Sequence, residues 1–223
     1  LSSSLINQIY QDRNGFIWIA TEDGLNRYDG AKFTIYKHEP NNEHSLAHNF
    51  VRTVFEDSKG HLLIGTYIGI QMYDPATDNF TPLAKLEDTG ETLESNINSF
   101  IERKNGEIWV SGNVLCKLDI KDHLLTVRKV DIAVTSPGSL FEDKKQNVWM
   151  AKGEEGVYQL TPDNQLTLHL SKDNGYVKSI CEDQRGNIYV GSIRKGLFIY
   201  DKERKTFVPG YPMNCISALT ARE

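Results

Sequence analysis

The sequence repeats with a period of 40–46 residues, and this repeat constrains the fold more than any other feature. One slot of each repeat holds an aromatic or large aliphatic residue, at Trp18, Leu63, Trp109, Trp149 and Tyr189. Six residues earlier stand Asp12, Asp57, Arg103, Asp143 and Asp183, and three residues earlier stand Gly15, Gly60, Gly106, Gln146 and Gly186. Agreement at several fixed offsets indicates a tandem array in which each unit is one supersecondary structure.

Each unit predicts four short β-strands. The first strand carries apolar residues three apart, such as Val51 and Val54, and the second is rich in Ile, Trp and Val. Between them, an Asp that binds nearby backbone amides and a Gly that adopts positive φ predict a hairpin turn. Convincing helical periodicity is absent from the sequence, so we expect little helix. The sequence therefore predicts an all-β fold, a β-propeller of four-stranded antiparallel blades.

The repeats predict a single β-propeller segment over residues 1–223. Its units span residues 1–45, 46–91, 92–134, 135–172 and 173–211, and residues 212–223 start a sixth. In that last stretch Ile216 and Leu219 repeat the apolar pair of the first strand. Five complete repeats plus the first strand of a sixth lead us to expect part of a larger propeller.

The repeats are specific enough to indicate a family. The segments from Asn49 to Gly69 and from Asn7 to Tyr28 resemble the two-component regulator propeller repeat, and the linker from Tyr36 to Asn49 resembles that family's blade connections. The similarity is strongest in the first two repeats and recognisable in the fifth. The third and fourth repeats depart from the pattern, with Arg103 for the turn Asp and Gln146 for the turn Gly.

The resemblance implies a function. In that family the propellers form the periplasmic sensor region of membrane-bound hybrid two-component histidine kinases, and many respond to oligosaccharides from polysaccharide breakdown. It therefore implies a ligand-sensing, non-enzymatic segment located in the periplasm. The implied partners are an oligosaccharide or other small ligand, a second copy in a homodimer, and the remaining blades and kinase of the parent chain. A protein-interaction scaffold and a propeller lyase or hydrolase stay open as alternatives.

Composition excludes several other classes. The chain has 25 basic and 30 acidic residues without a basic run, which gives no electrostatic case for nucleic acid. Its apolar stretches are all shorter than a membrane span, so we expect no membrane contact within this segment. The three cysteines, Cys116, Cys181 and Cys215, match no CxxC ligand pattern and leave the redox compartment undecided.

The chemistry-bearing residues favour structural roles over catalysis. Three histidines, His38, His44 and His48, share a loop without the framework that zinc requires, so we expect no metal and no cofactor. The Asp-x-x-Gly turns offer too few oxygen ligands for a calcium loop. The tryptophans share one slot and are expected to fill the space between blades rather than stack on sugars. We find no nucleophile motif and predict no catalytic residue.

A ligand site is expected where varied loops meet at one face of the repeated scaffold. The candidates lie in the turns between second and third strands, or on first strands directly after an apolar residue. The predicted ligand-binding residues are Arg52, Tyr67, Asn98, Asn113, Lys178, Arg194 and Lys195. The four cationic residues among them would suit an acidic saccharide.

Overall fold

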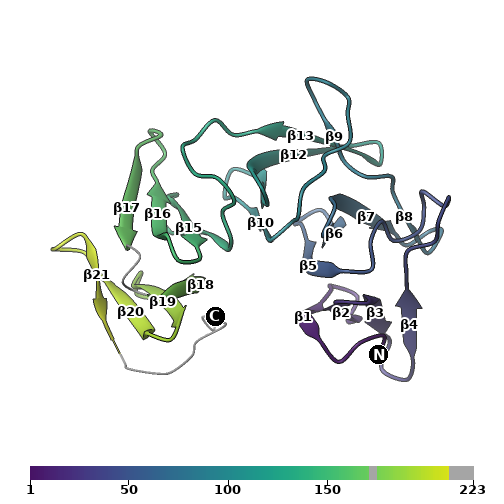
Figure 1. Ribbon diagram of the computed structural model, residues 1–223, viewed down its shortest axis with the longest axis horizontal. Coiled ribbons are helices and arrows are strands. Elements are labelled where there is room, and N and C mark those ends of the chain that lie inside the picture. Colours follow the sequence, from purple (N-terminus) through teal and green to yellow (C-terminus); the bar gives the residue numbers. More distant parts are fainter. Residues whose placement is uncertain (171–174, 211–223) are drawn as a thin grey trace. The chain divides into compact units, whose positions relative to one another are not determined.

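The protein is all-β, as the sequence predicts. The computed structural model describes residues 1–170 and 175–210, and within these ranges the regular elements are all strands (Figure 1). In this described part there is no helix long and apolar enough to cross a membrane. The predicted start of a sixth unit, with Cys215, Ile216 and Leu219, lies outside the described residues.

The chain folds into two compact units, Leu1–Asp131 and Ile132–Glu223. Unit 1 contains three sheets. The first sheet consists of β1 (Ile6–Gln11), β2 (Ile17–Thr21), β3 (Gly24–Tyr28) and β4 (Phe33–Tyr36). The second consists of β5 (Val51–Glu56), β6 (Leu62–Thr66), β7 (Ile70–Asp74) and β8 (Asn79–Phe80). The third contains β10 (Ser99–Glu102), β11 (Ile108–Ser111), β12 (Leu115–Lys121) and β13 (Leu124–Lys129).

The third sheet gains a strand that the sequence did not predict. Strand β9 (Lys85–Leu86) lies in the connection after the second sheet and pairs in parallel with β13, with Lys85 opposite Thr126 and Leu86 opposite Val127. The sheet order is therefore β10-β11-β12-β13-β9. The predicted unit 46–91 thus supplies a strand to the blade that follows it.

Unit 2 contains two further four-stranded antiparallel sheets (Figure 1). The fourth sheet consists of β14 (Leu140–Glu142), β15 (Val148–Lys152), β16 (Gly156–Leu160) and β17 (Leu166–Leu170). The fifth consists of β18 (Tyr176–Glu182), β19 (Ile188–Ile193), β20 (Gly196–Asp201) and β21 (Thr206–Pro209). Five sheets in the order of the repeats confirm the blade architecture.

A β-bulge recurs in the first strands of three sheets. The extra residue is Asn7 in β1, Arg52 in β5 and Lys178 in β18. A bulge puts two residues opposite one and bends the strand, which re-aims the extra side chain. It also explains why apolar residues three apart, such as Val51 and Val54, are both buried, although a regular strand has a period of two.

The Asp that recurs in four of the five hairpin turns binds both the turn and the following strand. In the first sheet, Asp12 Oδ1 accepts hydrogen bonds from the N–H groups of Asn14 and Phe16 at 3.0 and 2.9 Å. Its Oδ2 accepts the indole N–H of Trp18 at 2.7 Å. The same arrangement joins Asp143 to Trp149 Nε1 at 2.9 Å. The Asp-x-x-Gly motif is therefore a structural turn that also satisfies a buried indole donor.

The two repeats that depart from the pattern compensate locally. In the third sheet Arg103 replaces the Asp, and Glu107 Oε2 accepts the Trp109 indole N–H at 3.1 Å instead. The Arg103 guanidinium lies 4.6 Å from the Trp109 ring centroid. In the fourth sheet Gln146 takes the glycine position with φ of 66°, in the left-handed region where glycine is favoured. The turn geometry survives both changes.

The hydrophobic core lies between neighbouring sheets within each unit. One cluster joins the first and second sheets, another joins the second and third, and a third joins the fourth and fifth. Trp18 and Trp149 are fully buried in these clusters. The Trp18 ring meets Tyr73 of the next sheet edge to face, with centroids 4.8 Å apart. The prediction that this slot packs between blades is confirmed.

Neighbouring sheets are also joined by one repeated polar contact. The residue after the turn Asp donates its backbone N–H to a Glu at or beside the end of the next sheet's first strand. The described pairs are Arg13 N to Glu56 Oε2 at 2.8 Å, Ser58 N to Glu102 Oε2 at 2.6 Å, and Lys144 N to Glu182 Oε2 at 3.0 Å. We call this contact the turn–Glu latch.

Candidate functional site

An exposed aromatic cluster in unit 1 surrounds one of the predicted ligand residues. Tyr67, in the turn after β6, is 54% exposed although its neighbours are partly buried. Its ring centroid lies 5.6 Å from the His48 ring and 6.1 Å from the Phe50 ring. The Tyr67 backbone N–H donates to the Phe50 carbonyl at 3.0 Å, which ties this turn to the segment entering β5. We call His48, Phe50 and Tyr67 the loop cluster.

His48 contributes a neutral ring to the loop cluster. Its Nδ1 accepts the backbone N–H of Phe50 at 2.9 Å, so the ring proton lies on Nε2. Burial, and then the charge of nearby His38, lowers the pKa of the His48 imidazole below its usual value. The ring therefore stays uncharged at neutral pH and presents an aromatic face beside Tyr67.

Arg52 extends the loop cluster toward the first strands. Its guanidinium carbon lies 5.9 Å from the Phe50 ring centroid. Because Arg52 is the extra residue of the bulge in β5, the strand itself redirects this side chain. The equivalent residue of β1, Asn7, donates its side-chain amide to the Val51 carbonyl at 2.7 Å. The structure thus brings Arg52 and Tyr67 together through Phe50.

The two predicted asparagines lie at the turns of the third sheet. The Asn98 backbone N–H donates to the Ser111 carbonyl at 2.8 Å, just before β10 begins. The Asn113 backbone N–H, in the turn before β12, donates to Ser95 Oγ at 3.0 Å. Asn113 is exposed and lines a cavity of about 720 Å³ together with Glu94. Both contacts are made by the backbone N–H groups of the asparagines.

The three remaining predicted residues lie in unit 2. Lys178 is the extra residue of the bulge in β18 and is exposed, and its carbonyl accepts the Ser139 hydroxyl at 2.5 Å. Arg194 and Lys195 form the exposed turn between β19 and β20. Arg194 has a φ of 84°, in the left-handed region. Their binding roles stay predictions.

The loop histidines have separate partners. His38 Nδ1 contacts the Leu46 carbonyl at 3.0 Å, whereas His44 Nδ1 contacts the Phe80 carbonyl at 3.2 Å. Across residues 1–170 and 175–210, we find no group of three or more His, Cys, Asp or Glu side chains arranged to hold a metal ion.

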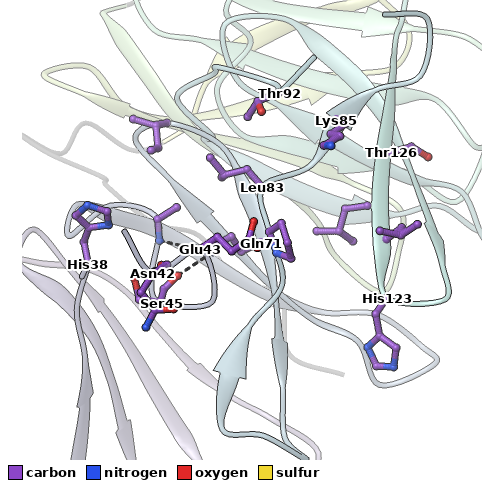
Figure 2. Close-up of a pocket in the computed structure, with 15 residues that line it drawn as sticks. His38, Asn42, Glu43, Ser45, Gln71, Leu83, Lys85, Thr92, His123 and Thr126 are labelled. Carbon is purple, nitrogen blue, oxygen red and sulfur yellow. Dashed lines mark hydrogen bonds between the residues drawn. The ribbon is translucent and has the colours of Figure 1, made fainter. Parts of the chain in front are cut away.

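A cavity of about 660 Å³ in unit 1 was not predicted from the sequence. Figure 2 shows it with His38 on one side, Thr126 on the other, and Gln71 between them. Its wall combines apolar side chains such as Leu83 and Leu125 with polar groups such as the Asn42 amide and the Ser45 hydroxyl. This volume and mixed lining are typical of a small-molecule site.

Gln71 fixes one wall of this cavity. The side chain is almost fully buried, and its Nε2 donates to the carbonyls of Ser45 and Thr81 at 3.0 and 2.9 Å. Its Oε1 accepts the Ala47 N–H at 2.6 Å (Figure 2). One amide thus anchors the connection between the first two sheets. The sequence signal for this cavity wall was a polar Gln between the apolar residues Ile70 and Met72. Its partners Ser45 and Thr81 are distant in sequence, so the sequence does not identify them.

The fold and the repeated turns define a β-propeller repeat protein. The profile of the "Two component regulator propeller" family matches residues 1–23, 45–67 and 171–194. These segments belong to the first, second and fifth repeats, where the sequence resemblance is clearest. These three repeats therefore match the repeat of the two-component regulator propeller family.

Two known proteins are similar to this chain, one in sequence and one in fold. A curated relative, histidine kinase P4 of Formosa agariphila, is 43% identical over 47 residues, which are 21% of this chain and 3% of the relative. The extracellular domain of BT4673 from B. thetaiotaomicron is 18% identical with a TM-score of 0.75, and the match covers 95% of this chain and 32% of that domain.

A similar fold also occurs in an enzyme. The catalytically inactive H270A form of virginiamycin B lyase from Staphylococcus aureus, solved with quinupristin, is 13% identical with a TM-score of 0.71. That match covers 99% of this chain and 77% of the lyase. The likeness shows a common fold. The chain spans about a third of the length of the BT4673 domain and a small fraction of the curated kinase.

Proposed function

We propose that this chain is the ligand-binding, non-catalytic part of a periplasmic sensor in a hybrid two-component system, and that it responds to oligosaccharides. The family of its repeats supports the sensor role. A second structural neighbour, the extracellular domain of BT3049 from B. thetaiotaomicron, is described as belonging to a hybrid two-component system. The oligosaccharide is inferred from the sequence resemblance and from the chemistry of the loop cluster.

The observation that carries the proposal is that the exposed Tyr67 ring and the Arg52 guanidinium both lie close to Phe50. A solvent-exposed aromatic ring offers an apolar face to a sugar ring, and a guanidinium offers several fixed hydrogen-bond donors for hydroxyl or carboxylate groups. The cluster is held by backbone contacts between two loops. Such variable loops on a rigid repeated scaffold are where binding specificity usually lies.

Ligand binding would act by shifting a conformational equilibrium. A ligand that contacts one arrangement of the sensor better than another favours that arrangement by its difference in binding free energy. In the proposed mechanism, binding at the loops changes how the sensor packs in a dimer, and the parent chain passes that change to its kinase.

Calorimetric titration of the full sensor region against a panel of oligosaccharides tests this proposal. We expect one polysaccharide class to bind, and we expect Tyr67→Ala or Arg52→Ala to weaken that binding at least tenfold. Phe33→Ala is the matched control, because Phe33 is 43% exposed but lies on β4, outside the loop cluster. If no class of oligosaccharide binds, the saccharide proposal is wrong.

The lyase alternative has a different requirement. A propeller lyase needs an acid–base residue where its loops converge. The described bulge positions of the first strands hold Asn7, Arg52 and Lys178. An Arg stays protonated in proteins and so cannot serve as a general base. Arg52 therefore suits a binding role better than a catalytic one.

A further inference from the structure

In unit 1, four aromatic side chains form a cage between the first and second sheets. The cage consists of Trp18, Tyr36, Tyr73 and Phe80. Trp18 stacks on Tyr36 at 5.9 Å, and Tyr36 meets Phe80 edge to face at 5.4 Å. The guanidinium of Arg27 occupies this cage, 5.7 Å from the Trp18 centroid and 5.6 Å from the Tyr36 centroid.

An ion pair within the chain occupies this cage, and we call the space between the first and second sheets the first groove. Arg27 Nη1 lies 3.0 Å from Asp78 Oδ1, and the hydroxyls of Tyr36 and Tyr73 both donate to the same oxygen at 2.6 Å. The protein thus supplies both the cation that sits among the rings and the anion that neutralises it.

In unit 2, the fourth and fifth sheets form a second cage of the same design. It consists of Trp149, His169, Tyr200 and Phe207. The Trp149 centroid lies 5.2 Å from His169, 5.1 Å from Tyr200 and 5.8 Å from Phe207. The tryptophans of the two cages share one slot of the repeat, so the two grooves can be compared position by position.

The ion pair of the first groove is replaced in the second. Strand register places Arg27 opposite Trp18 and Gln159 opposite Trp149, so a neutral Gln stands where the Arg stood. Asp78 directly precedes β8, the last strand of the second sheet, and Lys205 directly precedes β21, the last strand of the fifth. Their φ values are similar, 54° and 52°. The acidic position has therefore become basic.

The second groove is open and positively charged. It contains a cavity of about 570 Å³, within the range of small-molecule sites. Five cationic side chains line it: Lys144, Lys145, Arg185, Lys202 and Lys205. Two carboxylates also line it, although the chain as a whole has a net charge of −5. The groove therefore concentrates positive charge on an acidic protein.

The two carboxylates are already engaged within the protein. Asp143 Oδ2 accepts the Trp149 indole N–H at 2.9 Å, and its Oδ1 accepts two backbone N–H groups. Glu182 Oε2 accepts the Lys144 N–H at 3.0 Å, as part of the turn–Glu latch. The Lys144 ammonium donates to two carbonyls, so the other four cationic side chains are the groups that face an incoming ligand.

We propose that the groove between the fourth and fifth sheets binds a small organic oxyanion, a carboxylate or sulfate carried on a ring. The oxyanion would lie near Lys205. The Gln159 side chain lines the same cavity, and its amide N–H groups would be further hydrogen-bond donors. The ring would lie beside Tyr200 and His169, which are only partly buried. This site is separate from the loop cluster and goes beyond the proposed saccharide sensing there.

Equilibrium binding of glucuronate to the full chain of residues 1–223 tests the proposal, with glucose as the uncharged probe and sulfate ion as competitor. We expect saturable glucuronate binding, at least tenfold tighter than glucose, that weakens with added salt. We also expect sulfate to compete. Absence of saturable glucuronate binding, or failure of sulfate to compete, would overturn the proposal.

Variants locate the binding in this groove. Lys205→Asp, alone or with Gln159→Arg to rebuild the ion pair of the first groove, is expected to reduce glucuronate affinity at least tenfold. Lys59→Asp makes the same charge change at an exposed turn of unit 1 and is expected to leave affinity within twofold. Equal losses in Lys205→Asp and Lys59→Asp would show a nonspecific charge effect and refute the site. Circular dichroism of each variant confirms that the fold is retained.

Discussion

The groove between the first and second sheets and the groove between the fourth and fifth sheets share an aromatic frame but differ in what occupies it. In the first, Arg27 and Asp78 form an internal ion pair among the rings. In the second, Gln159 and Lys205 take these positions, and a cavity of about 570 Å³ remains. The two grooves therefore differ in charge at these two positions, while the frame residues stay similar.

The comparison explains how a repeat protein separates stability from recognition. The frame residues are large and mostly buried, so they contribute to the packing between neighbouring sheets. The polar positions above it contribute less to stability and are free to vary. Binding specificity can then change at those positions without loss of the blade architecture.

The largest expected effect is loss of a frame tryptophan. Trp18→Ala and Trp149→Ala each remove a fully buried ring and one hydrogen bond to the turn Asp, so each should lower the free energy of unfolding by about 3–5 kcal/mol. Urea denaturation followed by circular dichroism measures the loss. A loss below about 1 kcal/mol in either variant would contradict a common frame.

A smaller effect should separate the two grooves. Arg27→Met removes a cation from among the rings and leaves the Asp78 carboxylate with only the hydroxyls of Tyr36 and Tyr73, which should cost about 2 kcal/mol. The matched change Gln159→Met should cost less, about 1 kcal/mol, because it removes only the neutral hydrogen bond between Gln159 Oε1 and His169 Nε2 at 2.8 Å. Equal losses in the same urea experiment would mean that the two grooves are held in the same way.

The smallest expected effect is on the stability of the fold at acidic pH. Burial alone would raise the pKa of the Asp78 carboxyl, but hydrogen bonds from Tyr36 and Tyr73 and the charge of Arg27 outweigh it and lower the pKa. Between the second and third sheets, the hydrogen bond from Lys117 lowers the pKa of Glu107 to about 2 from an ordinary 4.5. Both folded pKa values lie below the unfolded values.

The sign of the pH effect follows from this depression. These carboxylates stabilise the fold above their unfolded pKa, and that contribution is lost as pH falls, for Glu107 between about 4.5 and about 2. Glu107→Gln should therefore make stability less dependent on pH in this range, whereas Lys205→Gln should not. Thermal melting at several acidic pH values measures the slope. If the slope of stability against pH is unchanged in Glu107→Gln, the ion pair between Glu107 and Lys117 does not contribute to acid sensitivity.

Much of the fold could be predicted because its signals are local. The turn Asp, the following Gly and the tryptophan slot lie within seven residues of one another, and the structure places them in one hairpin. The spacing of Val51 and Val54 held a further signal, since two residues three apart on one face of a strand imply a bulge.

The candidate sites could be predicted only in part, because their residues meet across sheets. Sequence reasoning selected Arg52 and Tyr67 but not Phe50, which connects them. It did not find the parallel pairing of β9 with β13, which depends on a connection folding back over the next sheet. It also did not select His169, because two partners of this ring, Tyr200 and Lys205, come from the next repeat.

The turn–Glu latch has a consequence for how such arrays grow. Each latch has its donor on one sheet and its acceptor on the next, as between Arg13 and Glu56 or Lys144 and Glu182. The contact is therefore directional and heterologous, and the same interface can be added any number of times. Duplication of one repeat would insert a blade that already fits both neighbours. The number of blades in a closed ring is then determined by the rotation between neighbouring sheets. The latch itself does not limit that number.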